Sequence, residues 1–586
     1  MRCFTADFET TTNPDDCRVW AWAVCEIGDT DNFEYGNSLD DFMEWCTYSK
    51  RNYRLYFHNL KFDGEFILWW LLDNGFEWIE NRKDRRDKTF TTLITDMGAW
   101  YSIEIYFKIG KNGTANKVTI YDSLKILNFS VDQIAKDFDL PINKLELDYK
   151  TNREKGHELT PHEVDYIRND VTIMAMALDY MMNVADLRKM TIAGDALSDF
   201  KSRCKSFKHY FPELDLDTDA EIRLSYKGGF TYLCDKYVNQ ETGAGVVFDI
   251  NSAYPACMVN NYLPFGFPER FEGKYKQDNL YNLYVQQLTC AFEIKEGKIP
   301  SIQLKRNMSF MPNEYIKTTN HKLVTLTLAS PDLELFFEHY HVYNITWQGG
   351  YKFKSCKGLF DSYINYWTEQ KISAKKEKNG AKTRTAKLML NSLYGRFGLN
   401  PRGATKRPVM LDDGVIHQIM MESEERKPIY IPVATFITAY VRKFIIESGQ
   451  KMREWTIKNK GFDGMVYFDT DSMHVTGIDE NDVEELAKDI FIDDYKLGAW
   501  KLESKYKHGK YLRQKCYIEL GYDDVMNVTV AGLPKKLSHL VTFDNFKSGF
   551  TTADFTDEEI GELGRKLTYK HVRGGVILAD TDFTIK

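Results

Sequence analysis

The sequence predicts a multidomain protein that combines α/β and α+β architecture, and three observations lead to that prediction. Its 586 residues are enough for about four domains of ~150 residues each. The amino-terminal third alternates strand-like and helix-like hydrophobic patterns. Farther along, two apolar strands each run into aspartates, and a basic helical stretch lies between them.

In the amino-terminal part, short strands are expected at residues 2–8, 53–57 and 119–121, and helices at residues 63–72 and 163–182. An alternation of this kind packs helices against a sheet. We therefore expect an α/β unit with a mixed sheet.

The remaining elements are expected from apolar runs and from turn residues such as Gly, Asn and Asp. They are a strand at 246–248, short strands and loops over 261–358, two helices over 363–393 with a turn near Asn379-Gly380, a hairpin-bearing insert at 401–428 with Asp412-Asp413-Gly414 as its turn, a helix at 435–459, a strand at 464–468 and a small unit after 531.

Composition narrows the class of protein. No run approaches the ~20 apolar residues that cross a bilayer, and the amino terminus lacks the apolar stretch of a signal peptide. We expect the protein to remain in the compartment where it is made. The ten cysteines form no C-x-x-C pair, so neither a zinc ribbon nor a redox motif is expected, and the thiols are interpreted as reduced packing residues.

The net charge of −8 hides two basic tracts. Residues 371–396 hold eight Lys or Arg against one Glu, and residues 501–515 hold six against one. Either tract alone is typical of a solvated face. Tyrosines interleaved with them favour a groove that follows a nucleic-acid backbone, and these are Tyr394, Tyr506, Tyr511 and Tyr517. Composition alone leaves both interpretations open.

A first set of carboxylates lies in the amino-terminal part. Asp7 and Glu9 are two apart on a strand, so their side chains leave the same face. Asp63 begins a helix, and Tyr166 and Asp170 lie one turn apart on another. Such carboxylates can hold Mg²⁺. The D-x-E pattern of Asp7 and Glu9 alone is more typical of a solvated edge strand. The prediction of a metal site therefore depends on Asp63, Tyr166 and Asp170.

In this order, the four carboxylates and the tyrosine resemble the DEDD-type 3′–5′ proofreading exonucleases, which have an RNase H-like fold. The resemblance implies two Mg²⁺ ions (Mn²⁺ possible) held by Asp7, Glu9 and Asp170, with Asp63 assisting and Tyr166 orienting water. It also implies contacts to single-stranded DNA, at Thr10, His58, Asn59, Phe62, Ser123 and Leu124, and a contact of Lys144 with the scissile phosphate.

A second set of carboxylates ends two apolar strands. One strand ends in Asp249, and the other runs into the Asp469-Thr470-Asp471-Ser472 turn. Two acids beside an apolar strand are costly without a cation. Between them, Lys387, Asn391 and Tyr394 form one polar stripe of a helix that suits a nucleotide; a solvated helix face is the alternative.

These three motifs, 249–255, 387–395 and 467–472, resemble motifs A, B and C of family B DNA polymerases, which have a right-hand fold of palm, fingers and thumb. The resemblance implies that Asp249 and Asp471 bind two Mg²⁺ ions and that Asp469 supports them. It also implies nucleotide contacts, at Ser252, Tyr254, Lys371, Lys387, Asn391 and Tyr394.

Further motifs extend the resemblance to DNA binding. Lys515 and Tyr517 match a primer-contacting K-x-Y motif, and Thr438 and Arg442 match a template-contacting motif. Tyr226, Gly228 and Gly229 match a Y-x-G-G linker that grips template, whose glycines let the backbone approach phosphate. Ala253 departs from the family, which commonly has Leu there, and this puts the packing beneath motif A in doubt.

Two stretches are longer than a bare palm and fingers require, from Pro255 to Lys371 and from Gly395 to Tyr467. In this the chain resembles the protein-primed subfamily, typified by the small replicases of Bacillus phages with linear genomes (Salasvirus-like). The resemblance implies a terminal-protein primer, strand displacement and residence in the cytoplasm of an infected bacterium. The expected domains are an exonuclease (1–190), palm (191–260 and 425–530), first insertion (261–358), fingers (359–398), second insertion (399–424) and thumb (531–586).

Three other interpretations remain open. A nucleic-acid-primed family B polymerase differs by lacking the two insertions. An exonuclease with a DNA-binding module accounts for the first carboxylates and not the second. A DNA-binding scaffold accounts for the basic tracts and for neither set of carboxylates.

Overall fold

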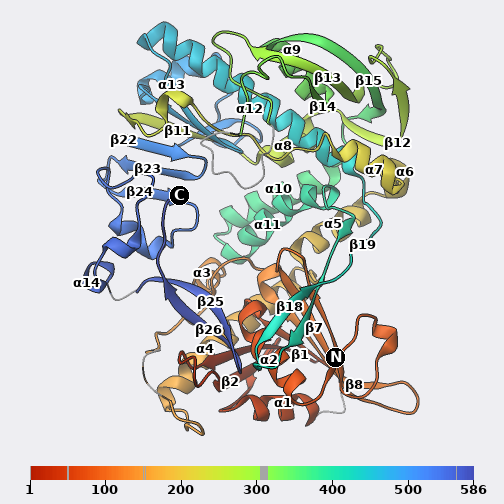
Figure 1. Ribbon diagram of the computed structural model, residues 1–586, viewed down its shortest axis with the longest axis vertical. Helices are drawn as coiled ribbons and strands as arrows, with labels where there is room; N and C mark the ends of the chain where they lie inside the picture. Colours follow the sequence, from red (N-terminus) through yellow and green to blue (C-terminus); the bar gives the residue numbers. More distant parts are fainter. Residues whose placement is uncertain (1, 49–51, 149–150, 152, 304–313, 562–563) are drawn as a thin grey trace.

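The computed structural model describes the chain except residues 1, 49–51, 149–150, 152, 304–313 and 562–563 (Figure 1). The amino-terminal part lies at one end of the molecule, and two other sheets lie at the opposite end. Helices α5 (Ile192–Arg203), α10 (Asp361–Lys376) and α11 (Gly380–Phe397) lie between them. Among the described residues, no helix is both long and apolar enough to cross a membrane.

The amino-terminal part contains an eight-stranded mixed sheet in the order β3-β2-β1-β4-β8-β7-β6-β5. Strand β1 is parallel to β4, β4 is parallel to β8, and β1 is antiparallel to β2, so the expected mixed sheet is confirmed. The strands are β1 (Arg2–Thr10), β2 (Val19–Glu26), β3 (Asp29–Gly36), β4 (Tyr53–Phe57), β5 (Glu77–Trp78), β6 (Thr89–Ile94), β7 (Trp100–Ile109) and β8 (Ala115–Asp122).

Helices α1 (Leu39–Tyr48), α2 (Leu60–Asp73), α3 (Val131–Asp137) and α4 (Pro161–Asp179) accompany this sheet. Helix α4 begins where Thr160 and Glu163 form a reciprocal capping box and Pro161 takes the first position, which satisfies backbone N–H groups that have no partner within the helix. The expected helices at 63–72 and 163–182 are confirmed, and the second ends in a π-helical turn (Tyr180–Val184).

A second sheet runs in the order β24-β23-β22-β11-β21-β20-β9, with β10 pairing to β22. Strand β11 (Gly245–Ile250) is flanked by β21 (Ser472–Thr476) and β22 (Trp500–Arg513). The pairing therefore brings the two predicted acid-bearing strands into one sheet. The others are β9 (Thr231–Leu233), β10 (Glu241–Thr242), β20 (Met465–Asp469), β23 (Cys516–Gly521) and β24 (Met526–Val530).

The segment expected to mix short strands and loops forms a four-stranded sheet of its own, in the order β12-β15-β13-β14. That prediction was wrong about strand length, because glycines that signal turns lie inside a strand here. A Cβ on Gly350 would lie 1.9 Å from the carbonyl oxygen of Val285, so only glycine fits. The elements are β12 (Leu263–Glu272), β13 (Leu283–Ile294), β14 (Val324–Ala329), α9 (Ser330–His339) and β15 (Tyr340–Cys356).

The remaining elements agree with expectation. Helices α10 and α11 are joined near Asn379, and the insert at 401–428 holds the hairpin of β17 (Lys406–Met410) and β18 (Ile416–Met420), with β16 (Arg402–Gly403) and β19 (Glu424–Glu425) at its base. Helix α12 (Ile431–Lys460) precedes β20. The smaller helices α5 to α8 lie between residues 192 and 260. Among them, α7 spans Leu216–Arg223 and α8 spans Ala253–Asn260. Helix α13 spans Glu480–Leu486.

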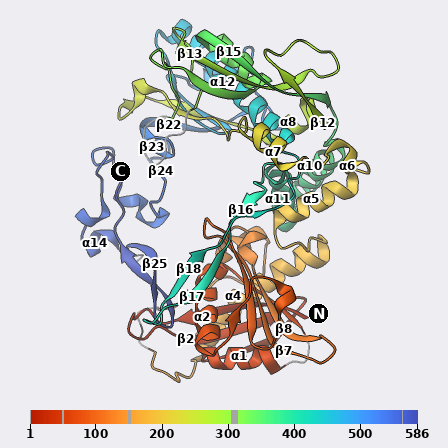
Figure 2. The ribbon, with the colours of Figure 1, turned by 45° about the vertical axis from the view of Figure 1, so that its right-hand side comes forward.

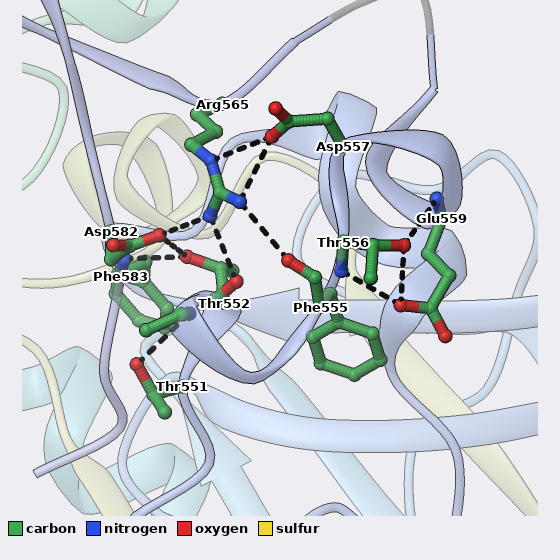
Figure 3. A network of polar contacts seen from close by, with 10 residues as sticks. Thr551, Thr552, Phe555, Thr556, Asp557, Glu559, Arg565, Asp582 and Phe583 are labelled. Atoms are coloured by element: carbon green, nitrogen blue, oxygen red, sulfur yellow. Dashed lines mark hydrogen bonds and ion pairs between the residues drawn. The ribbon is translucent and has the colours of Figure 1, made fainter.

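The carboxy-terminal unit ends in a hairpin, β25 (Lys566–Val572) and β26 (Gly575–Thr581), that returns to the amino-terminal part (Figure 2). Val576 and Ile577 are buried in the same apolar core as Phe57 and Phe66. Arg565 fixes the base of the hairpin, because it bonds Asp582 at 2.6 Å and Asp557, the first residue of α14 (Asp557–Ile560), at 3.0 Å (Figure 3).

The hairpin tips meet at the amino-terminal part. Trp69 of α2 donates from Nε1 to the carbonyl of Gly414, in the β17–β18 turn, at 3.1 Å. A Cβ on Gly414 would lie 3.2 Å from Arg573, in the β25–β26 turn. Chain segments far apart in sequence therefore come together beside α2.

Candidate catalytic centres and nucleic-acid interface

The first carboxylates gather in one cavity of about 670 Å³ at the end of β1. Asp7 and Glu9 of β1, Asp63 of α2 and Asp170 of α4 all line it, and so does Tyr166. Glu9, Asp63 and Asp170 are buried. The structure thus brings together every carboxylate of the predicted set.

Burial and mutual repulsion disfavour the charged forms of these acids. Burial, followed by the charge of Asp170, raises the pKa of Asp7 to about 7. Burial, followed by the charge of Asp7, also raises the pKa of Glu9 and of Asp63. Burial raises the pKa of Asp170 although Lys144, which forms an ion pair with it, opposes the shift.

These residues fit a divalent cation. Oδ1 of Asp63 and Oδ1 of Asp170 are buried and have no hydrogen-bond partner among the described residues. Buried carboxylates of one sign need a compensating positive charge. In the described part of the chain, no three His, Cys, Asp or Glu side chains are already arranged as a metal site.

The second carboxylates meet at the end of β11. Asp249 and Asp469 are both register partners of Ser472 on β21. The intervening turn is tight: Thr470 has φ of +62°, the N–H of Asp471 donates to the carbonyl of Asp469 at 2.7 Å, and the N–H of Ile250 donates to that of Asp471 at 2.8 Å.

In this second centre, as in the first, burial and neighbouring acids disfavour the charged forms of the carboxylates. Burial, followed by the charge of Asp471, raises the pKa of Asp249 to about 7. Burial, followed by Asp469, raises the pKa of Asp471. Nζ of Lys515 lies 3.5 Å from Oδ1 of Asp469, which partly neutralises that acid. Glu503 adds negative charge to both shifted groups and is an acid that the sequence interpretation missed.

Comparison with known proteins identifies the family. Residues 45–489 match the family described as DNA polymerase type B, organellar and viral. The DNA polymerase of Bacillus phage Nf is 44% identical over 100% of both chains, and that of Streptococcus phage Cp-1 is 32% identical over 100% of this chain and 99% of its own. The chain belongs to the type B DNA polymerases.

The structural comparison agrees over the full length. The phi29 DNA polymerase solved with primer-template DNA and incoming nucleotides aligns with a TM-score of 0.90 and 42% identity over 100% of both chains. This type B polymerase is therefore a phi29-like, protein-primed DNA polymerase that carries a 3′–5′ exonuclease. Family B DNA polymerases generally use divalent metal ions, in keeping with the two carboxylate centres.

The predicted nucleotide-binding residues converge beside the second centre of this polymerase. The rings of Tyr254 and Tyr394 stack, with centroids 4.0 Å apart. Burial, followed by the charge of Lys375, lowers the pKa of Lys371, and Lys387 contributes further. The two predicted phosphate-binding lysines, from α10 and α11, therefore lie in one positive field. Lys387 and Asn391 are exposed on α11, and Ser252 precedes α8 with φ of +54°.

The predicted template motif is not exposed. Thr438 and Arg442 are only 1% and 4% exposed, and their contact with template stays a prediction. Arg442 forms an ion pair with Asp332 and donates at 2.8 Å to the carbonyls of Lys227 and Gly228. Because buried guanidinium groups need such partners, Arg442 holds the linker that contains Tyr226.

The two linker glycines have different surroundings. Gly228 is exposed, and an added Cβ would meet nothing within 4 Å. On Gly229, a Cβ would lie 2.6 Å from Cγ2 of Thr470. Close packing of the linker on the Asp469–Ser472 turn therefore requires glycine at 229, a reason that the predicted approach to phosphate did not include.

Five predicted DNA contacts line the first cavity, and two, Ser123 and Leu124, do not. Thr10, His58, Asn59, Phe62 and Lys144 line it. Leu124 lies nearby and is half-buried, whereas Ser123 is fully buried and donates to the carbonyl of Phe57 at 3.0 Å. Direct DNA contact by Ser123 stays a prediction; in this structure Ser123 lies 3.1 Å from Nδ1 of His58 and orients that ring.

The tyrosines of the second basic tract are also not available for stacking. Tyr506 and Tyr511 are 1% and 0% exposed, so the predicted aromatic groove does not include them. Tyr517 is half-buried, and Lys515 occupies the β22–β23 turn with φ of +53°. Position within a basic tract did not indicate which residues of β22 are buried, because the register of this strand is irregular between Tyr506 and Arg513.

The carboxy-terminal hairpin adds residues to the first cavity that the sequence interpretation missed. They are Leu567, Tyr569, Leu578 and Asp580. The hydroxyl of Tyr569 accepts from Nδ2 of Asn59 at 3.0 Å. Alternation of apolar and polar residues over 566–572 was the available signal, and it predicts a strand without indicating where that strand docks.

Proposed function

We propose that the two carboxylate centres of this DNA polymerase perform opposite reactions on the primer end. Asp249, Asp469 and Asp471 serve nucleotide addition, and Asp7, Glu9, Asp63 and Asp170 serve nucleotide removal. The observation that carries this proposal is that two separate sheets each converge on carboxylates whose pKa is raised by burial and by one another. Each cluster holds more carboxylates than the single lysine that pairs with it can neutralise, and divalent ions that serve phosphoryl transfer would supply the missing positive charge.

Each centre is proposed to take two Mg²⁺ ions, with Mn²⁺ as a possible substitute. Asp249 and Asp471 hold the pair at the polymerisation centre, and Asp7, Glu9 and Asp170 hold the pair at the exonuclease centre. When bound, divalent ions neutralise phosphate charge and favour deprotonation of the attacking oxygen.

For nucleotide addition, the primer 3′ oxygen attacks the α-phosphate of a dNTP and pyrophosphate leaves. Lys371 and Lys387 neutralise the leaving phosphates, with Asn391 and Ser252 in support. Tyr254 and Tyr394, stacked at 4.0 Å, bound the base and sugar. Lys515 and Tyr517 retain the primer end, and Tyr226, Gly228 and Gly229 guide the template, held by Arg442 and Thr438.

For nucleotide removal, water attacks the terminal phosphodiester and the 3′ oxygen of the preceding nucleotide leaves. Tyr166 orients the water, and Lys144 transfers its contact from Asp170 to the scissile phosphate. Thr10, His58, Asn59, Phe62 and Leu124 hold the single strand, with Ser123 supporting His58.

The chain is proposed to divide as the sequence predicts, into an exonuclease (1–190), palm (191–260 and 425–530), first insertion (261–358), fingers (359–398), second insertion (399–424) and thumb (531–586). The separate sheet of β12 to β15 supports the first insertion as a unit. The contact of Gly414 with Trp69 and Arg573 supports a second insertion that encircles DNA and favours strand displacement. A terminal protein that supplies the priming hydroxyl is the proposed partner, in the cytoplasm of an infected bacterium.

One assay tests these assignments together. Purified protein is given Mg²⁺, labelled dNTP and either a primed circular template or a terminal protein of a Bacillus phage with its origin DNA. Long displacement products and label transferred to the terminal protein are expected. Extension without any transfer to terminal protein favours the nucleic-acid-primed alternative, and degradation without extension favours the exonuclease alternative.

A further inference from the structure

Three buried polar side chains lie beneath the polymerisation centre and belong to none of the motifs above. His474 of β21, Tyr511 of β22 and Glu519 of β23 are 2%, 0% and 3% exposed. We call them the buried triad. Its members come from three strands, so the triad joins parts of the second sheet that are far apart in sequence.

The triad is tightly bonded. Nδ1 of His474 lies 2.7 Å from Oε1 of Glu519, and the hydroxyl of Tyr511 donates to the same oxygen at 2.6 Å. Burial alone raises the pKa of Glu519, but His474 and then Tyr511 reverse the effect and hold it below its usual range. Because an ionised carboxylate only accepts, both partners are fixed as donors, and the network has one arrangement.

The triad encloses the ring of Tyr467, which precedes Asp469 by two residues on β20. The ring of Tyr467 lies 5.3 Å from that of His474 and 5.9 Å from that of Tyr511. The ring of Tyr517 closes the group at 5.4 Å. Tyr467 is fully buried, so a shift of the triad moves its ring.

The hydroxyl of Tyr467 emerges on the catalytic side. It accepts from the backbone N–H of Lys515 at 2.8 Å and lies 3.4 Å from Oδ2 of Asp469. Nζ of Lys515 lies 3.5 Å from the other oxygen of Asp469. Tyr467 therefore joins the β22–β23 turn to the catalytic acid, and the left-handed backbone of Lys515 depends on such support.

We propose that the buried triad positions Tyr467 and, through it, the Lys515 turn that retains the primer end. The triad members are positioning residues, since none touches the reacting atoms. This inference rests on the proposed primer contact of Lys515. It adds that the affinity for primer is set by a network that lies beneath the surface on which DNA rests.

The test uses two conservative changes, Tyr511→Phe and Glu519→Gln, which keep the shape of the network and remove one hydroxyl or one charge. Each is measured alone and combined with Lys515→Ala in the full-length protein. Each single change is expected to raise the KM for primer-template about tenfold, with kcat within about twofold. Degradation of single-stranded DNA at the exonuclease centre should be unchanged. Unchanged degradation would show that the variant protein is folded.

The double variants test whether the buried triad acts through Lys515. If the triad acts through Lys515, Tyr511→Phe should cost almost nothing further once Lys515→Ala is present. Equal losses in both backgrounds, or a fall in kcat without a change in KM, would overturn the inference. Tyr340→Phe is the matched control, because Tyr340 is also buried and bonded, to the carbonyl of Ile316 at 2.9 Å, and belongs to the sheet of β12 to β15 rather than to the buried triad; a similar rise in KM there also overturns it.

Failure of the proposed primer contact of Lys515 can be distinguished from failure of the inference about the buried triad. If Lys515→Ala alone leaves primer affinity unchanged, the proposed primer contact of Lys515 is wrong, and the inference falls with it. If Lys515→Ala weakens primer binding and both triad variants bind normally, only the inference is wrong. Because Glu519→Gln can destabilise the protein, a second measurement of Tyr511→Phe, which keeps the pair of His474 and Glu519, settles the outcome.

Discussion

The two catalytic centres of this polymerase use the same groups in different settings. Each places carboxylates at a strand end and pairs one of them with a lysine. In the exonuclease centre, Lys144 pairs with Asp170, whose side chain is 6% exposed. In the polymerisation centre, Lys515 pairs with Asp469, whose side chain is 20% exposed, and Lys515 itself is 59% exposed.

The difference lies in which acid the lysine engages. Lys144 engages a carboxylate proposed to bind metal, so metal and lysine compete until DNA arrives. Lys515 engages the supporting acid and leaves Asp249 and Asp471 for the metal. The comparison therefore predicts that metal binding displaces Lys144 from Asp170 in the exonuclease centre, whereas metal can bind Asp249 and Asp471 without displacing Lys515.

The largest expected effect comes from separating the two centres. Asp471→Ala should lower primer extension about a thousandfold or more while degradation of single strands continues, because each set of acids serves one reaction. Asp170→Ala should do the reverse. Extension and degradation are measured on the same preparations. Equal loss of both activities in either variant would show that the centres are not independent.

The two lysines should differ in what they control. Lys144→Ala should slow degradation about a hundredfold at saturating single strand, since the lysine is placed to meet the scissile phosphate. Lys515→Ala should mainly weaken primer-template binding and leave kcat near its usual value. Single-turnover rates and binding by gel shift distinguish the two. A faster exonuclease in Lys144→Ala contradicts the phosphate role and supports a purely inhibitory one.

The acids should also make stability depend on pH in a metal-free buffer. The pKa of Asp7 is raised from 3.8 to about 7. Its contribution to stability is therefore full below pH 3.8 and lost as pH rises through about 7. Asp7→Asn should raise the Tm by about 2 °C at pH 8 and leave it unchanged near pH 4.

Thermal melts with EDTA and with Mg²⁺ test that expectation. Added Mg²⁺ should stabilise the parent protein at pH 8 more than the Asp7→Asn variant, because the variant has lost a ligand. Asp249→Asn should behave alike, since the pKa of Asp249 is also raised to about 7. A gain in Tm for Asp7→Asn that is the same at pH 4 and pH 8 contradicts the electrostatic explanation.

The smallest expected effect concerns the packing behind the polymerisation centre. A cavity of about 240 Å³ beside Ala253 is lined by Tyr440, Phe444 and Phe491. Ala253→Leu should fill part of it and stabilise the protein by about 1 kcal/mol. Ala434→Leu is the control, because Ala434 is fully buried on α12 and does not line this cavity, so it should lower the Tm. A lower Tm for Ala253→Leu would show that the cavity cannot admit the side chain.

Much of the fold follows from local patterns. The mixed sheet, the helices around Asp63 and Tyr166 and the turn at Asn379 were all predictable because hydrophobic period and turn residues act over a few residues. Strand lengths in 261–358 were not, since Gly350 is a turn signal by composition and a packing requirement by environment.

The grouping of the acids was predictable for a different reason. Asp7, Asp249 and Asp471 lie in short motifs, so a few residues sufficed to predict it, and their catalytic roles stay proposals. Burial of Ser123 and Arg442 depends on segments 66 and 110 residues away, and that of Tyr511 on the packing of neighbouring strands, so no local pattern reports it. The partners that reorganise these residues, such as Asp332 for Arg442, are visible only in the folded protein.

The carboxy-terminal hairpin also has a consequence for how the protein is made. Tyr569 and Leu578 help to wall a cavity whose acids begin at Asp7. During synthesis the acids leave the ribosome first, and the hairpin that walls the cavity leaves last. The emerging chain therefore exposes the unfinished cavity and the apolar surface of Phe66 throughout synthesis. The hairpin that completes this cavity contacts residues that are very distant in the sequence, and such contacts form slowly. Proofreading competence should therefore arrive late in the folding of each new molecule.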